Sequence, residues 1–159
     1  MEYYATYLSK EIDIYRYCEY CIEQDEKDID IDSNILDKIV QIINAHGFNI
    51  AIDRTQSSLT TIEIFNHKAT IEREDTFPPH REKEEFPNTV TFCCCVKNTC
   101  KGGELGFYEL FENKPSILVN TNDTNKMAHI VFFNDKIMHT GQPFSNGVRQ
   151  LVSIHINIY

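Results

Sequence analysis

The sequence predicts an α+β fold that is mainly β: a β-sandwich or jelly roll supported by one or two helices near the N-terminus. From residue 48 onward, short runs rich in Ile, Val, Phe and Thr are separated by Gly, Pro and Asn, a pattern typical of strands and turns. Before residue 48, apolar residues recur at helical spacing. A chain of 159 residues with 42% hydrophobic content can bury the core of one domain. We therefore expect a single domain, with helical support over residues 1–47 and a β core over residues 48–159.

Two helices are expected in the N-terminal part. The first covers residues 8–24, within a tyrosine-rich stretch. An acidic run over residues 25–32 then indicates a solvated linker. Asp32 or Ser33 can cap the second helix, and Gly47 can end it. Between these residues, apolar side chains recur at the spacing of one helix face: Ile35, Leu36, Ile39, Val40, Ile42 and Ile43. This second helix is expected to pack against a sheet.

Nine strands are expected in the remainder of the chain. They cover residues 48–52, 58–65, 68–72, 89–96, 104–110, 117–121, 128–133, 137–139 and 149–159. Gly102 and Gly103 permit a turn or a bulge before the fifth of these strands. So many short strands after a helical segment are the basis for expecting a sandwich or a jelly roll.

Charge and hydropathy exclude several classes of protein. The net charge of −9 at pH 7 argues against a general phosphate-binding surface, because nucleic-acid affinity depends on Lys and Arg. We therefore expect no nucleic-acid partner, and a small molecule or a peptide as the substrate. No stretch is long and apolar enough to cross a membrane, and no apolar N-terminal signal segment is visible. The expected location is the cytoplasm.

The six cysteines are expected to be reduced and buried. Cys93, Cys94 and Cys95 are consecutive on a predicted strand and so point to alternate faces, which suits packing better than disulfides. Cys18 and Cys21 have the spacing of a metal or redox pair. No second Cys-x-x-Cys completes a zinc site, so packing is the preferred interpretation there too.

His80, Glu82 and His139 are the candidate metal ligands. Two imidazoles and one carboxylate suffice to hold iron(II) on one face of an octahedron, which leaves the opposite face for a cosubstrate and O2. Residues two apart in a strand point to the same side, so His80 and Glu82 can reach one metal. His139 must be brought in by the fold, for example on a neighbouring strand. Arg149 follows ten residues later and is suited to bind a carboxylate through two hydrogen bonds.

Simpler interpretations apply to other residues of the same types. His46, His67, His129 and His155 are expected to be surface residues or hydrogen-bonded core residues, which is the usual role of a lone histidine. A surface charge is the alternative for Arg149, although this residue follows a glycine turn and opens an apolar strand.

Five motifs occur in an order that resembles one enzyme family. They are Pro79-His80-Arg81-Glu82, Thr89-Val90-Thr91-Phe92, the run from Gly102 to Tyr108, His139-Thr140-Gly141-Gln142-Pro143 and Gly147-Val148-Arg149. Their order and spacing are similar to those of the iron(II)/2-oxoglutarate dioxygenases. The resemblance is closest to the prolyl-hydroxylase-like branch, whose members show His-x-Asp, a Gly-Gly pair opening a strand, a distal His-x-x-x-Pro and a late Arg. It covers residues 58–159, about two-thirds of the chain.

The resemblance implies a double-stranded β-helix, which is a form of jelly roll, with the metal between its sheets. It implies that His80, Glu82 and His139 bind iron(II) and that Arg149 binds the distal carboxylate of 2-oxoglutarate. The reaction would be the oxidative decarboxylation of 2-oxoglutarate to succinate, coupled to hydroxylation of a C–H bond in a peptide or protein side chain, prolyl foremost. The reaction would consume O2, and ascorbate is expected to stimulate it.

The chain departs from the family pattern at three positions. Glu82 is one methylene longer than the usual Asp. Many relatives place a cosubstrate-binding Tyr on the strand that here reads Phe92-Cys93-Cys94-Cys95-Val96. Some relatives carry a hydroxyl two residues after the Arg, where this chain has Leu151. Thr91 and Ser153 are the candidates to replace these cosubstrate contacts.

These departures leave a second hypothesis open. It is a catalytically impaired mimic of a prolyl hydroxylase, acting as a binding module for a cellular hydroxylase or its substrate. Isoleucine, at 20 residues, far outnumbers leucine, at 7, as in AT-rich genomes, so a large DNA virus with a host protein as partner is one hypothesis for the source. A third hypothesis, nucleic-acid dealkylation, is disfavoured. Dealkylating relatives resemble Arg-x-Asn-x-Thr-x-Arg, whereas residues 149, 151, 153 and 155 are Arg, Leu, Ser and His.

Overall fold

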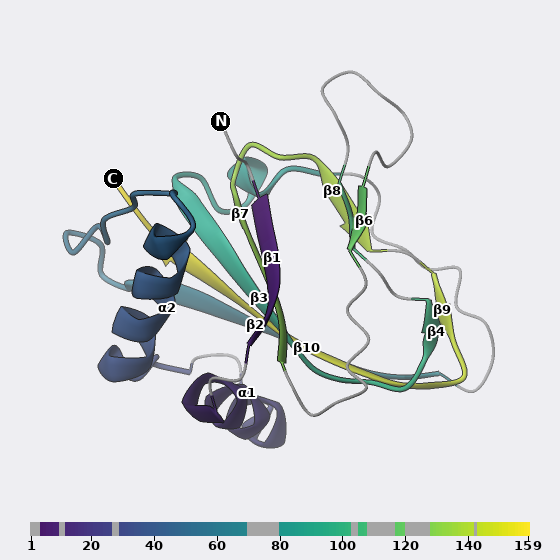
Figure 1. The fold of residues 1–159 in the computed structure, drawn as a ribbon. Helices are drawn as coiled ribbons and strands as arrows, with labels where there is room; N and C mark the ends of the chain where they lie inside the picture. Colours follow the sequence, from purple (N-terminus) through teal and green to yellow (C-terminus); the bar gives the residue numbers. More distant parts are fainter. Residues whose placement is uncertain are drawn as a thin grey trace.

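The computed structural model describes residues 4–9, 12–26, 29–69, 80–102, 105–107, 117–119, 128–141 and 143–159. In these segments ten strands pair in antiparallel fashion, and two α-helices lie near the N-terminus. The protein is therefore an α+β protein that is mainly β, as predicted (Figure 1).

A five-stranded antiparallel sheet forms the centre of the fold. Its strands follow the order β1 (Tyr4–Ser9), β7 (Ala128–Asn134), β3 (Thr89–Asn98), β10 (Gly147–Asn157) and β2 (Thr60–Ala69). Two smaller sheets lie beside it on the right of Figure 1, away from the helices. One contains β6 (Ile117–Val119), β5 (Leu105–Phe107) and β8 (His139–Gly141), and the other pairs β4 (Lys101–Gly102) with β9 (Phe144–Ser145).

Two helices cover one face of the large sheet. Both α1 (Ile12–Gln24) and α2 (Ser33–Ala45) contribute buried apolar side chains to a core shared with the strands. Strand residues alternate between the two faces. Phe92 and Cys94 of β3 belong to the core beneath the helices, whereas Cys93 packs on the opposite face, against the small sheet that contains β5. Every second residue of the central strands therefore points away from the helices.

The helix α2 begins and ends close to its predicted limits. Asp32 caps it, because the Oδ1 atom of Asp32 accepts hydrogen bonds from the N–H groups of Asn34 (2.9 Å) and Ile35 (3.2 Å). Gly47 follows the helix with a φ of 89°, a backbone conformation that glycine adopts without strain.

The predicted first helix was wrong at its start. It begins at Ile12, and residues 8 and 9, which were expected in the helix, belong to strand β1 (Tyr4–Ser9). β1 pairs with β7 from Tyr4 opposite Phe133 to Ser9 opposite Ala128. Pairing with β7 places these residues in the sheet, and their tyrosine and threonine residues suit a strand.

The predicted strand over residues 48–52 was also wrong. Only Ile52 makes an isolated bridge. Asn49 has a φ of 54°, which interrupts an extended run. The side chain of Asn44 hydrogen-bonds both the N–H group (2.6 Å) and the carbonyl group (3.1 Å) of Ile50, so this backbone needs no neighbouring strand.

β2 joins two strands that were predicted separately. Residues 58–65 and 68–72 were expected to be interrupted, yet β2 runs from Thr60 to Ala69 and pairs with β10 throughout. A continuous partner strand carries the pairing across residues 66 and 67. Residues 70–72 lie outside the described residues.

The other predicted strands agree more closely. β3, β7 and β10 start and end within about two residues of their predicted limits. β8 lies slightly later in the chain than its prediction, and β5 and β6 fall inside two predicted strands whose remaining residues lie outside the described part.

β4 and β9 were not predicted, because each contains only two residues. A side chain at Gly102, where φ is 80°, would place its Cβ 2.2 Å from the carbonyl oxygen of Pro143, so only glycine fits. Gly102 belongs to strand β4 and has the positive φ for which a glycine was expected, whereas Gly103 lies outside the described residues.

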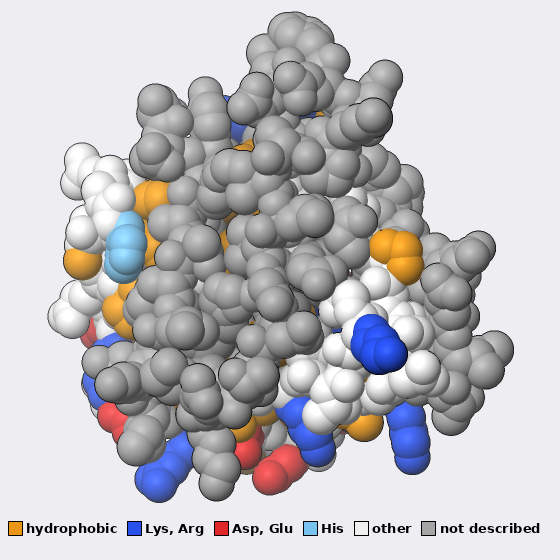
Figure 2. Space-filling model, turned by 45° about the vertical axis from the view of Figure 1, so that its right-hand side comes forward, with side chains coloured by type: hydrophobic (Ala, Val, Ile, Leu, Met, Phe, Trp, Pro, Cys, Tyr) orange, Lys and Arg blue, Asp and Glu red, His pale blue; other side chains and the backbone are white. Residues whose placement is uncertain are grey.

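All six cysteines lie in described segments, and they are buried thiols without a disulfide. Cys18 and Cys21 belong to the core between α1 and the large sheet, which agrees with the packing interpretation. No described helix is long and apolar enough to cross a membrane. Figure 2 shows Lys and Arg side chains alongside Asp and Glu side chains at the lower edge of one face, so the described charges there are of both signs.

Candidate metal centre

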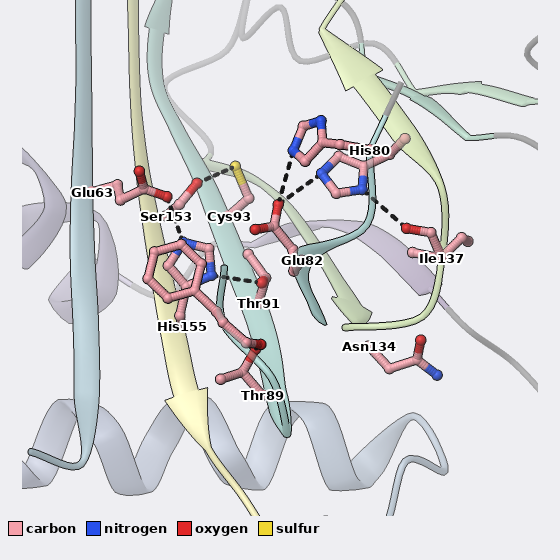
Figure 3. A network of polar contacts seen from close by, with 12 residues as sticks. Glu63, His80, Glu82, Thr89, Thr91, Cys93, Asn134, Ile137, Ser153 and His155 are labelled. Atoms are coloured by element: carbon pink, nitrogen blue, oxygen red, sulfur yellow. Dashed lines mark hydrogen bonds and ion pairs between the residues drawn. The ribbon is translucent and has the colours of Figure 1, made fainter. Parts of the chain in front are cut away.

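His80, Glu82 and His139 meet at one point in the structure. Oε1 of Glu82 lies 2.8 Å from Nε2 of His139 and 3.3 Å from Nε2 of His80 (Figure 3). One potential ligand atom from each residue lies within 4.8 Å of the others. The two imidazoles and the carboxylate that the sequence singled out therefore converge and could hold a metal ion.

Two short elements bring these residues together. His80 and His139 form an isolated antiparallel bridge in which each N–H group donates to the other residue's carbonyl oxygen at 3.0 Å. Arg81 is extended, but Glu82 is the first residue of a short 3-10 helix, η1 (Glu82–Glu84). The expectation that His80 and Glu82 share a regular strand was therefore wrong, whereas the expected pairing of His139 with the segment of His80 is present.

Neighbouring contacts hold η1 in place. The N–H group of Lys83 donates to the carbonyl oxygen of Asp135, and the N–H group of Phe86 donates to the carbonyl oxygen of Glu82. Glu82 is only 7% exposed as a result. Burial alone raises the pKa of Glu82, but hydrogen bonds from His139 and His80 lower it more, so this pKa lies well below its usual range.

The hydrogen bonds of His139 leave an electron pair facing Glu82. Nδ1 of His139 lies 3.2 Å from the carbonyl oxygen of Ile137, which can only accept, so Nδ1 carries a proton and donates it. With only that proton on the ring, Nε2 presents a lone pair to a carboxylate oxygen 2.8 Å away, whereas a second proton on Nε2 makes the hydrogen bond to Glu82 described above. Two such lone pairs are stable at this distance only with a cation beside them, either a proton or a metal ion.

The distances from Glu82 to the two imidazoles fit those between ligands of one metal ion. Metal–ligand bonds of about 2.1 Å place neighbouring donors of an octahedron roughly 3.0 Å apart. The observed separations of 2.8 and 3.3 Å bracket this value. A donor set of two imidazoles and one carboxylate is typical of iron(II) sites with open positions.

The three residues open onto a cavity of about 440 Å³, which lies between the large sheet and the sheet containing β8. Arg149 of β10 lines the same cavity and is 6% exposed. Its guanidinium carbon lies 5.5 Å from the centre of the Phe144 ring, a distance that allows a cation–π contact. The fold therefore brings all four predicted site residues to one cavity, and Arg149 is not a surface charge.

Thr91 and Ser153 also line the cavity, but each hydroxyl group already has a partner in the protein. Ser153 donates to the sulfur of Cys93 at 3.4 Å, and Thr91 lies 2.8 Å from a ring nitrogen of His155. Burial raises the pKa of the Cys93 thiol to about 11, so this thiol stays protonated in the cavity floor at neutral pH. The floor therefore carries a neutral thiol and two hydroxyl groups, each with a hydrogen-bond partner inside the protein.

The other histidines divide into three groups. His46 is exposed at the end of α2, and His67 is half-buried against the ring of Phe144. The side chain of His129 lies outside the described residues. His155 is a hydrogen-bonded core residue as expected, yet it also lines the cavity.

The positions of His155 and Glu63 in the cavity were not predicted from the sequence. The alternation of side chains along the last strand could have predicted the position of His155. Every second residue there faces the cavity: Arg149, Leu151, Ser153 and His155.

Comparison with known proteins adds no relative to these observations: no family model matches the sequence, and no curated protein matches it.

Proposed function

We propose that the protein is an iron(II)- and 2-oxoglutarate-dependent oxygenase that hydroxylates a side chain in a peptide or protein. The convergence of His80, Glu82 and His139 on a cavity that also contains Arg149 carries this proposal. The resemblance of the sequence to the prolyl-hydroxylase-like branch gives the reaction class, with O2 as the oxidant.

The placement of the cavity supports a double-stranded β-helix as the fold. His139 comes from β8 in a small sheet, and Arg149 comes from β10 in the large sheet. A site between two antiparallel sheets is the arrangement that this fold implies.

Each residue has a defined part in this proposal. His80, Glu82 and His139 would hold the iron, and Arg149 would bind the distal carboxylate of 2-oxoglutarate through two hydrogen bonds. Bound iron would supply the oxidative decarboxylation of 2-oxoglutarate to succinate that drives hydroxylation. Leu105, Phe133 and Leu151 line the cavity with apolar surface, which excludes water from the reacting groups.

A mimic without turnover is the second candidate, and Cys93 is the observation in its favour. The Cys93 thiol, which accepts a hydrogen bond from Ser153, lies in the cavity floor. Members of the prolyl-hydroxylase-like branch place a cosubstrate-binding phenol on this strand. Against it, the Glu82 carboxylate is directed at both imidazoles, and a binding module has no need of that arrangement.

Succinate release tests the oxygenase directly. Purified protein with iron(II), ascorbate and 2-oxoglutarate should form succinate slowly without a peptide substrate. His139→Ala and Arg149→Ala should abolish this release, whereas His46→Ala, which changes an exposed histidine outside the cavity, should not. Mn(II) binding without any succinate would favour the mimic, and failure to bind Mn(II) would overturn the proposal.

A further inference from the structure

A second histidine–glutamate pair occupies the cavity floor. Nε2 of His155 lies 2.6 Å from Oε1 of Glu63, and Nδ1 of His155 lies 2.8 Å from Oγ1 of Thr91 (Figure 3). Thr91 and His155 are 1% and 2% exposed, whereas the side chain of Glu63 is 38% exposed. All three residues line the cavity that contains the candidate metal ligands. A chain of buried polar groups therefore leads from the floor of the cavity to its solvent side.

With His155 as a neutral imidazole, the partners of its two nitrogens set the direction of the hydrogen bonds. The carboxylate of Glu63 can only accept, so Nε2 of His155 carries a proton and donates it. In the neutral imidazole Nδ1 then accepts, and the hydroxyl group of Thr91 donates to it. The single hydroxyl proton of Thr91 is thereby used inside the protein. Thr91 and Glu63 therefore present only acceptor lone pairs to a ligand, and such a surface selects a ligand group with N–H donors.

Arg149 and His155 mark two ends of the cavity floor. They lie on the same face of β10 and are six residues apart, which is about 20 Å in an extended strand. The Arg149 end suits a carboxylate, and the Glu63 end suits a cation. The exposed residues Glu84 and Glu85 line the cavity as well. Arg81 also lines the cavity, and its Nε donates a hydrogen bond to the carbonyl oxygen of Lys136.

We infer that the Glu63–His155–Thr91 end of the cavity binds a cationic side chain of the substrate, the ammonium group of lysine or the guanidinium group of arginine. Phe65 and Leu151 line the cavity as apolar surface against which the methylene groups of such a side chain can pack. This inference rests on the proposed function, because it names the substrate class of the same cavity. It favours a basic residue over a prolyl residue, since a proline ring in a peptide offers no N–H donor.

Peptide binding tests the inference without turnover. The probes are fluorescein-labelled Gly/Ser nonapeptides with one central residue: lysine, norleucine, arginine, citrulline or proline. Fluorescence anisotropy is measured with Mn(II)- and 2-oxoglutarate-loaded protein and again with metal-free protein. Lysine and arginine peptides should bind at least about tenfold more tightly than their neutral analogues, because a hydrogen bond to a charged group is stronger than one between neutral groups.

Three variants locate the effect. Glu63→Gln should reduce the preference for charge to within about twofold, since it removes the charge and retains the shape. Thr91→Val has nearly the same shape without the hydroxyl group, and it should weaken binding of the lysine peptide; it also serves as the test if Glu63→Gln does not fold. Glu23→Gln changes an exposed carboxylate on α1 outside the cavity and should leave the preference intact.

Several results would overturn the inference. They are equal binding of lysine and norleucine peptides, tightest binding of the proline peptide, a charge preference that survives Glu63→Gln, or no binding of any peptide. The succinate assay is a separate measurement. A charge preference without succinate release would support this subsite and reject the oxygenase. Succinate release without a charge preference would support the oxygenase and reject this subsite.

Discussion

Two histidine–glutamate pairs share one cavity, and they differ in what the second nitrogen of each ring contacts. His139 lies 2.8 Å from Glu82, and His155 lies 2.6 Å from Glu63. The other nitrogen of His139 faces the carbonyl oxygen of Ile137, which can only accept. With the proton on Nδ1, a lone pair of Nε2 faces a lone pair of Glu82, and a cation, either a second proton or a metal ion, is needed between them.

The other nitrogen of His155 meets a hydroxyl group, which can donate or accept. Every proton in the chain from Thr91 to Glu63 can therefore find an acceptor, and no cation is needed. A histidine–carboxylate distance alone does not identify a metal ligand. The partner of the far nitrogen decides whether the pair is a ligand set or a hydrogen-bonded chain.

Substitution of a metal ligand should show the largest difference between the two pairs, measured as affinity for Mn(II). His139→Ala should lower the affinity for Mn(II) by more than about a hundredfold, because loss of a supporting partner alone commonly costs 10–100-fold. His155→Ala should lower it by no more than about tenfold. Electron paramagnetic resonance of free Mn(II) measures both. Equal losses in the two variants would mean that the pairs do not differ in role.

Metal binding should also stabilise the protein. Mn(II) at a hundred times its dissociation constant contributes about 2.7 kcal/mol to the free energy of unfolding. For a domain of this length that is roughly 5–10 °C in the melting temperature. The increase should be present in wild type and in Glu63→Gln and absent in Glu82→Gln. Differential scanning fluorimetry with and without EDTA makes the comparison, and an increase retained in Glu82→Gln would place the metal elsewhere.

The sequence predicted the first pair far better than the second. His80, Glu82, His139 and Arg149 were identified because motif order along the chain is readable without coordinates. The role of His155 depends on Glu63, which lies 92 residues away in the chain and becomes its partner only when β2 pairs with β10. A contact of that kind leaves no local pattern to read.

The same limit explains the errors in the fold. Elements whose pattern is local, such as α2 with its Asp32 cap, were predicted closely. β1 was missed because its stability comes from pairing with β7, more than a hundred residues later. The expected strand containing Glu82 was wrong because contacts of η1 with Asp135 and Phe86 set its conformation.

Phe86 contacts both pairs, and its substitution should have a smaller effect on Mn(II) affinity. This ring stacks on His155 at a centroid distance of 4.0 Å, and its N–H group donates to the carbonyl oxygen of Glu82. Phe86→Ala keeps this N–H group but removes the ring that packs η1 against His155, so Mn(II) binding should weaken by up to about tenfold. Phe86→Tyr retains the stack and should bind Mn(II) as wild type does. An unchanged affinity in Phe86→Ala would show that the two pairs are independent.

In metal-free protein, Glu82 and Glu63 should differ in how their contribution to stability changes at acid pH. This is the smallest of the expected effects. The folded state holds the pKa of Glu82 below its ordinary value of 4.5, so between the folded-state pKa and 4.5 the unfolded state binds more protons. The stability contributed by Glu82 is therefore present above pH 4.5 and is lost as the pH falls below it. One proton changes the free energy of unfolding by at most about 1.4 kcal/mol per pH unit. Urea unfolding in EDTA measures the free energy of unfolding from pH 6 to pH 3. This free energy should fall less steeply with decreasing pH in Glu82→Gln than in wild type, whereas Glu63→Gln should follow wild type. Equal slopes for wild type and Glu82→Gln would mean that the two imidazoles do not hold this carboxylate in its charged form.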